Sequence, residues 1–154
     1  MSLVYLGLGT NLGDKEQNLN NAVMALTLEV GDVLRVSSFY RSKPWGYDSK
    51  NEFLNAVALV ETSLTPFEVL QKTQEIERNL GRTAKTATGY SDRLIDLDIL
   101  MYDNLILDQP TLTIPHPLLA VRDFVLLPLS EMAPDLVHPV LGKSIIELRR
   151  ELIP

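Results

Sequence analysis

Cysteine is absent from this chain of 154 residues, and so is any long apolar run. The lack of cysteine excludes a disulfide scaffold, a Cys-ligated zinc site and thiol catalysis. No apolar run approaches the ~18 residues that a membrane span requires. The apolar N-terminal stretch has no basic residues before it, so it predicts a first strand and not a signal peptide. We therefore expect a cytoplasmic protein without a membrane segment.

An excess of positive charge is lacking as well. The chain has 14 Lys and Arg against 20 Asp and Glu, for a formal net charge of −6. This balance disfavours non-specific binding to nucleic acid or to an anionic membrane. Small molecules remain as the expected partners, and we expect a monomer. Since the sequence shows no repeat, linker or low-complexity tract, residues 1–154 are predicted to form a single domain.

What the sequence does contain is an alternation of strand and helix patterns. Helical periodicity follows Asp14, which can cap a helix, and Thr65, which begins a capping box with a proline at the first helical position. Gly31 and Gly81 are expected to end these two helices. Short apolar runs bounded by Gly, Pro and Asn predict strands over 3–8, 33–40, 53–62 and 95–102.

The order of these elements predicts an α+β fold. Strand, helix, strand, strand, helix, strand is typical of a ferredoxin-like βαββαβ core, in which an antiparallel sheet carries helices on one face. The proline-rich last third predicts a C-terminal extension of short strands and helices. Its final helix is expected to begin at Ser144, where Glu147 completes a capping box. Because this architecture hosts many functions, the function has to be argued from a site.

The sharpest motif is an acidic pair in the last predicted strand, Asp96 and Asp98. Residues two apart in a strand face the same side, roughly 6.6 Å apart along the chain, so the two carboxylates project together. Adjacent carboxylates repel unless a cation lies between them. Mg²⁺ suits oxygen ligands and completes its shell with phosphates and waters. The alternative is a solvated strand face, but the strand is otherwise strongly apolar, which favours a metal site.

Positive charge gathers directly before this pair. Cations beside metal-binding carboxylates are what a polyphosphate site needs. The segment is small, polar and without periodicity, so it indicates a loop that could close over a ligand; a solvated connection is the alternative. Residues 78–93 hold four basic residues and one acidic residue: Arg78, Arg82, Lys85, Arg93 and Asp92.

A third group of residues suits a flat heterocycle. Phe53 and Asn55 share one face of a predicted strand, which sets an aromatic platform beside a hydrogen-bonding amide. Trp45 in the preceding loop could line the same pocket. His116 is held between two prolines and could contact a ligand. The alternatives are a core phenylalanine, a strand-end asparagine and a structural histidine.

Several short runs, in this order and spacing, give a specific resemblance. Over nearly its whole length the chain resembles the 6-hydroxymethyl-7,8-dihydropterin pyrophosphokinase family. That family transfers the terminal diphosphate of ATP to the hydroxymethyl group of the dihydropterin in folate biosynthesis and releases AMP. The runs are Gly9-Thr10-Asn11-Leu12-Gly13, Ser37-Ser38-Phe39-Tyr40-Arg41, Phe53-Leu54-Asn55-Ala56, Gln74-Glu75-Ile76-Glu77, Gly81-Arg82, Arg93-Leu94-Ile95-Asp96-Leu97-Asp98-Ile99-Leu100, Pro115-His116-Pro117, Arg122-Asp123-Phe124 and Pro128-Leu129.

The resemblance also implies roles at the phosphate end of the site. Asp96 and Asp98 would bind two Mg²⁺ ions along the triphosphate of ATP, the co-substrate. Arg82 and Arg93 would neutralise phosphate charge, with His116 and Arg122 assisting. Where the family has an aromatic-Gly-Pro-Arg run, this chain has residues 89–93 instead, and the residues that could substitute as ATP contacts are Lys85 and Tyr90.

The remaining implied roles concern the two ring systems. Gln74 and Glu77 would border the nucleotide site, and Ile99 with Thr113 would lie near adenine. Phe53 and Phe124 would sandwich the pterin while Asn55 contacts its polar edge. Backbone groups around Ser42 and Trp45 would complete that edge.

Two rival functions fit part of the same pattern. A metal-dependent nucleotidyl- or glycosyltransferase also uses paired aspartates. A small-molecule-binding regulatory domain could share the topology, but it has no need for Asp96, Asp98 and Arg93 together. Release of AMP with transfer of diphosphate separates the pyrophosphokinase from both.

Overall fold

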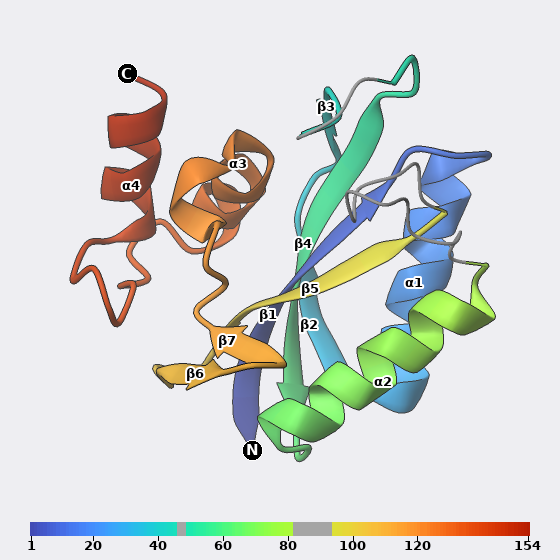
Figure 1. Cartoon of the computed structure of the whole chain (residues 1–154), viewed down its shortest axis with the longest axis horizontal. Coiled ribbons are helices and arrows are strands. Elements are labelled where there is room, and N and C mark those ends of the chain that lie inside the picture. Colours follow the sequence, from blue (N-terminus) through green and yellow to red (C-terminus); the bar gives the residue numbers. More distant parts are fainter. Residues whose placement is uncertain (46–48, 82–93) are drawn as a thin grey trace.

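The computed structural model describes residues 1–45, 49–81 and 94–154. Its main sheet is antiparallel, with the strand order β2-β4-β1-β5. A further short strand, β3, pairs with the first residues of β4, on the same edge of β4 as β2. This arrangement confirms the predicted antiparallel sheet of a split βαβ core (Figure 1). Its strands are β1 (Ser2–Thr10), β2 (Asp32–Val36), β3 (Tyr40–Ser42), β4 (Phe53–Thr62) and β5 (Asp96–Tyr102).

The expectation of one strand over residues 33–40 is wrong, because two separate strands share this stretch. The pairing of β2 with β4 shifts register between Val33 and Arg35. Directly after β2, the backbone amide of Ser37 donates to the carbonyl of Val57 in β4. The hydroxyl of Ser37 in turn accepts a hydrogen bond from the Val57 amide at 2.9 Å. These side-chain and backbone bonds interrupt the ladder. The strand resumes as β3, which pairs with the first residues of β4.

Two helices cover one face of the sheet. The helix α1 (Lys15–Glu29) is capped by Asp14, whose side chain accepts the Gln17 amide, and α2 (Pro66–Asn79) begins with the predicted capping box at Thr65. Figure 1 shows both helices on the same side of the strands. Their apolar stripes pack on the residues of β1, β4 and β5 that point to this side, and the main core contains Leu6, Leu19, Leu26, Val60, Val69, Ile76, Leu97 and Ile99.

The two core helices lie on one face as expected, and the opposite face carries a second layer from the predicted C-terminal extension. Val57, Leu100 and Met101 point away from α1 and α2, and apolar side chains on both faces of a sheet need two covers. That second cover is the helical part of the C-terminal extension (Figure 1): a 3₁₀ turn (Leu119–Val121), α3 (Asp123–Met132) and α4 (Ile145–Leu152). The hairpin of the extension, β6 (Leu107–Gln109) and β7 (Leu112–Ile114), packs instead on the main core through Leu112 and Ile114. Among the described residues, no helix combines the length and the apolar character needed to cross a membrane.

Candidate active site

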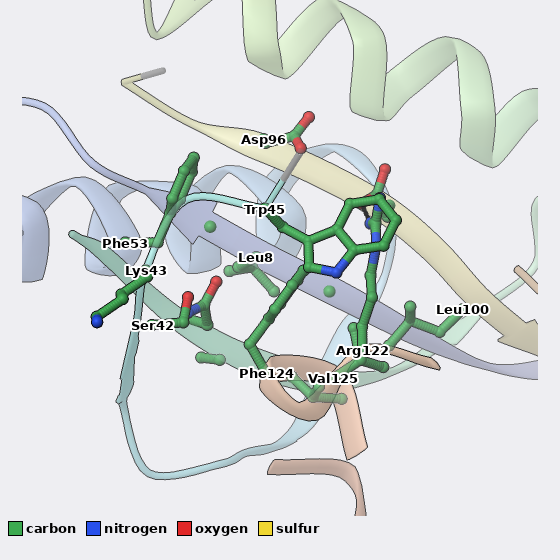
Figure 2. Close-up of a pocket in the computed structure, with 16 residues that line it drawn as sticks. Leu8, Ser42, Lys43, Trp45, Phe53, Asp96, Leu100, Arg122, Phe124 and Val125 are labelled. Carbon is green, nitrogen blue, oxygen red and sulfur yellow. Dashed lines mark hydrogen bonds and ion pairs between the residues drawn. The ribbon is translucent and has the colours of Figure 1, made fainter. Parts of the chain in front are cut away.

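A pocket opens on the α3 side of the sheet, beside the start of that helix. Its walls come from β1, β4, β5, the loop after β3, and the segment that leads into α3 (Figure 2). The structure brings together here both aspartates and the five residues expected to contact the pterin. The predicted site residues that line the pocket are Ser42, Trp45, Phe53, Asn55, Asp96, Asp98, Arg122 and Phe124.

The two aspartates stand on the pocket side of β5. Both are half-buried, whereas Leu97 between them is buried beneath α1 and α2. In the sheet register Asp96 lies opposite Gly9 and Asp98 lies opposite Gly7. Because glycine has no side chain, β1 places only backbone opposite each carboxylate.

Three pocket residues, Gly7, Gly9 and Lys43, were not predicted as site residues from the sequence. Gly7 and Gly9 line the floor, and a Cβ added at Gly9 would lie 3.3 Å from Oδ1 of Asn55 and 3.6 Å from the Phe53 ring. Glycine therefore gives the amide and the aromatic ring their room. Lys43 adds a positive charge to the lining. Its place between two predicted site residues, Ser42 and Trp45, was the one hint available.

Arg122 joins the aromatic wall of the pocket to the carboxylates. Its guanidinium carbon lies 4.6 Å from the centroid of the Trp45 ring and 5.4 Å from that of Phe124 (Figure 2). One terminal nitrogen is 3.9 Å from Oδ2 of Asp98. The residue is only 9% exposed, and its Nε is buried without a hydrogen-bond partner in the described part of the chain. A buried N–H without a hydrogen-bond partner calls for an explanation, and a bound ligand that accepts its hydrogen bond would supply one.

Asn55 presents one particular atom to a ligand. The residue is buried, and its Nδ2 donates to the carbonyl of Tyr40 at 3.1 Å and to the hydroxyl of Ser42 at 2.8 Å. These bonds use both amide hydrogens and tie β3 to β4. The oxygen Oδ1 lies toward Gly9, at the pocket floor, and it is an acceptor suited to a ring N–H or an amino group.

Of the residues expected around the nucleotide, Arg122 lines this pocket, and several others lie along the outer edge of β5. The described ones that do not line the pocket are Gln74, Glu77, Ile99, Thr113 and His116. Glu77 is buried on α2, and its carboxylate accepts the amide of Leu97 at 2.9 Å. The amide of His116 donates to the carbonyl of Leu100 at 2.9 Å. Ile99 is buried in the main core, Thr113 is half-buried on β7, and Gln74 is exposed.

Four predicted residues lie outside the described part of the chain, namely Arg82, Lys85, Tyr90 and Arg93. The loop that was expected to close over a ligand lies there as well.

His116 is held as a neutral imidazole. Burial, and secondarily the charge of Arg122, lower its pKa to about 4, against an opposing effect of Asp96. Its Nδ1 accepts the amide of Leu118 at 3.1 Å, so the neutral ring carries its proton on Nε2. That N–H is a donor that suits a phosphate oxygen at neutral pH.

We predict that His116 titrates near pH 4 in the folded protein, and that the unfolded value stays near 6.5. Because the unfolded state then binds more protons between these two values, stability falls as the pH drops from about 6.5 to about 4. Nitrogen-15 spectra of the histidine rings give the midpoint directly. Urea unfolding of His116→Asn and of the wild type should show a pH slope in this window that is smaller in the variant; a midpoint at or above 6.5 would contradict the prediction.

Comparison with known proteins decides the family. The model of the family 7,8-dihydro-6-hydroxymethylpterin-pyrophosphokinase matches residues 5–134. The chain belongs to this family. The resemblance inferred from the sequence is therefore confirmed, and it favours the pyrophosphokinase over the two rival functions. The enzyme transfers diphosphate from ATP to the hydroxymethyl group of 6-hydroxymethyl-7,8-dihydropterin and releases AMP, a reaction of folate biosynthesis.

Relatives of similar length support this assignment. The chain is 48% identical over 141 residues to the 2-amino-4-hydroxy-6-hydroxymethyldihydropteridine pyrophosphokinase of Porphyromonas gingivalis. The matched region covers 90% of this chain and 95% of the relative. The enzyme of the same name from Aquifex aeolicus is 38% identical over 151 residues, covering 98% and 92%. A longer relative, the folic acid synthesis protein FOL1 of Dictyostelium discoideum, is 41% identical, and the chain spans 21% of it.

Solved structures show the same fold. A structure of HPPK-DHPS in complex with substrates covers 99% of this chain with a TM-score of 0.79 at 14% identity. A Plasmodium falciparum HPPK-DHPS structure gives a TM-score of 0.78 at 17% identity. The enzyme spans 43% of each of these chains, less than half of their length.

The acidic pair fits the ion that the family chemistry suggests. Among the described residues, no cluster of three or more His, Cys, Asp or Glu could hold a metal ion by itself. Two carboxylates on one strand face are instead a partial set of oxygen ligands, and Mg²⁺ takes such a set when phosphates and waters supply the rest. The donor set of the enzyme therefore suits Mg²⁺ carried on a nucleotide.

Proposed function

We propose that Asp96 and Asp98 hold two Mg²⁺ ions along the triphosphate of ATP, so that the enzyme depends on Mg²⁺. The observation that carries the proposal is that both carboxylates share one pocket with an aromatic and amide lining. A pterin in this lining and a triphosphate on the carboxylates would meet at the floor formed by β1 and β5.

Diphosphate transfer asks mainly for in-line positioning and for neutralisation of phosphate charge. Bound Mg²⁺ supplies such neutralisation and can acidify the attacking hydroxyl. Arg122, beside Asp98, adds a planar cation that suits phosphate oxygens. His116 would donate a hydrogen bond from its Nε2–H to a phosphate oxygen. Arg82 and Arg93 would add positive charge from the segment before β5. Arg82, Arg93, Asp96 and Asp98 are thus the proposed catalytic residues.

The pterin would lie between Phe53 and Phe124, which enter the pocket from β4 and α3. Ring stacking suits a flat heterocycle. Oδ1 of Asn55 would accept from a donor on the pterin edge, because the amide hydrogens of Asn55 are already used by β3. Backbone groups near Ser42 and Trp45 would complete the contacts.

The nucleotide would lie along the outer side of β5. His116 and Glu77 contact the backbone of this edge, which supports the proposal that ATP is surrounded by Gln74, Glu77, Ile99, Thr113 and His116. The family resemblance would add Lys85, which lies outside the described residues. Ile99 is buried, so its backbone is the part available to adenine.

We further propose that residues 1–154 act as one domain and as a monomer in the cytoplasm, on small molecules and without nucleic acid or membrane. One antiparallel sheet carries both cores, which supports the single domain. The net charge of −6 supports the absence of nucleic acid.

The function is tested by incubating the protein with ATP, Mg²⁺ and the hydroxymethyl-dihydropterin. With a label on the γ-phosphate, the label should appear in the pterin product while AMP accumulates. A nucleotidyltransferase would instead release labelled diphosphate and place AMP on the pterin. Chelation of Mg²⁺ should stop the reaction, and re-addition should restore it; turnover that persists under chelation would exclude the metal role of Asp96 and Asp98.

Asn55→Ala is expected to weaken pterin binding about tenfold, since the ligand loses a buried acceptor worth on the order of 1–3 kcal/mol. The same change removes the bonds to Tyr40 and Ser42, so the melting temperature should fall as well. Binding of ATP alone should stay near the wild-type value. Calorimetric titration of both ligands checks this, and an equal loss for ATP and for the pterin would show a folding defect in place of a recognition role.

A further inference from the structure

The acidic pair lies on an edge strand of the sheet. In the order β2-β4-β1-β5, only β1 pairs with β5 among the described strands, with Leu97 opposite Leu8. Backbone amides on the outer edge of such a strand have no ladder partner, and a buried amide needs one. The geometry between Asp96 and Asp98 therefore depends on what bonds to this outer edge.

The helix α2 supplies that partner. Oε2 of Glu77 accepts the amide of Leu97 at 2.9 Å. Glu77 is 3% exposed and Leu97 is 6% exposed, so the bond lies inside the protein. A carboxylate acceptor makes a stronger bond to an amide than a neutral acceptor does. This amide belongs to the peptide unit that links Asp96 to Leu97, directly between the two acidic side chains.

Packing alone does not explain a carboxylate at this position. The apolar residues Val69 and Ile76 already fix α2 on the main core. A buried carboxylate costs free energy unless its bonds offset the loss of water. By contrast Thr73, buried one turn earlier on α2, uses its hydroxyl on the Leu70 carbonyl of its own helix.

We propose that Glu77 is a positioning residue: through the Leu97 amide it sets the backbone from which Asp96 and Asp98 reach the metal-bound triphosphate. The inference rests on the proposed metal role of these aspartates and deepens it. It assigns Glu77 a task through the protein backbone, which is separate from a direct contact with the nucleotide.

The test separates the reach of the side chain from its charge. Glu77→Gln keeps an acceptor oxygen at the same reach and loses the charge, whereas Glu77→Asp keeps the charge and shortens the reach by about 1.5 Å. Thr73→Val is the matched control, since it alters a buried side chain of the same helix without a bond to β5. Two readouts are measured: amide exchange of Leu97 in the ligand-free protein, and the affinity for Mn²⁺ with the α,β-methylene analogue of ATP.

For Glu77→Asp we expect exchange of the Leu97 amide to speed up, and Mn²⁺–nucleotide affinity to fall, by about tenfold each. Glu77→Gln should stay within about threefold of the wild type in both, because a neutral acceptor keeps part of the bond. Thr73→Val should change neither readout, even if its melting temperature falls.

The proposal would be overturned by a larger loss for Glu77→Gln than for Glu77→Asp, by equal losses in both variants, or by no change in either. Faster Leu97 exchange with unchanged metal affinity would overturn it too. Wild-type protein that binds no Mn²⁺ with the nucleotide would instead refute the metal site itself, and the Leu97 exchange would still report on the Glu77 bond.

Discussion

Asp98→Asn is expected to slow diphosphate transfer by about 100-fold or more, because metal charge stabilisation contributes several kcal/mol to the barrier. The substitution removes one anionic ligand and keeps the shape of the side chain. Stability should change little or even rise, since repulsion from Asp96 is relieved. The ion pair with Arg122 spans 3.9 Å and its carboxylate side chain is 37% exposed, so its loss costs little.

Single-turnover rates at saturating Mg²⁺ and ATP measure this effect, and thermal melting checks the fold. The matched control is Asp108→Asn, at an exposed aspartate of β6, which should leave the rate unchanged. A near-normal rate for Asp98→Asn would remove Asp98 from the metal site.

Arg122→Met is expected to lower kcat/KM for ATP by about 100-fold, since charge-assisted bonds to phosphate are worth up to about 3 kcal/mol. Methionine keeps an unbranched apolar stem against Trp45 and Phe124 and removes the cation that lies over both rings. The kcat/KM of Arg122→Lys should lie between that of the wild type and that of Arg122→Met, because an ammonium keeps the charge but lacks the planar donor geometry of a guanidinium.

Trp45 is the only tryptophan of the chain, so its fluorescence reports directly on the loss of the Arg122 guanidinium. Removal of the guanidinium from its ring face should change the Trp45 emission in the ligand-free protein. Arg150→Met, an exposed arginine of α4, is the control for loss of one positive charge. If Arg122→Met kept kcat/KM within about twofold of the wild type, Arg122 would have a purely structural role.

The local signals in the sequence were sufficient for most of the elements. Capping at Asp14, Thr65 and Ser144 was read correctly, because a cap depends on residues within one helical turn. The prediction of one strand over residues 33–40 failed because the strand is interrupted by the hydrogen bonds between Ser37 and Val57, twenty residues away. A pattern read along the chain does not contain that partner.

The site was recognised in the same uneven way. Alternation along a strand was enough to place Asp96 and Asp98 on one face, since the period of a strand is two. Sequence spacing did not reveal that Gly7 and Gly9 would lie opposite them, or that Lys43 would join the lining. These neighbours come from β1 and from the loop after β3, which only strand pairing brings together with β5.

The sequence by itself determined the α+β class, the helix starts, the shared face of the acidic pair and the family to which the chain belongs. These depend on local periodicity and on residue order. Only the tertiary structure decided that α3 and α4 would cover the second face. It alone set Arg122 between Asp98 and the aromatic rings and joined the Glu77 carboxylate to the Leu97 amide. Such contacts join residues distant in sequence, and the packing of the whole chain selects them.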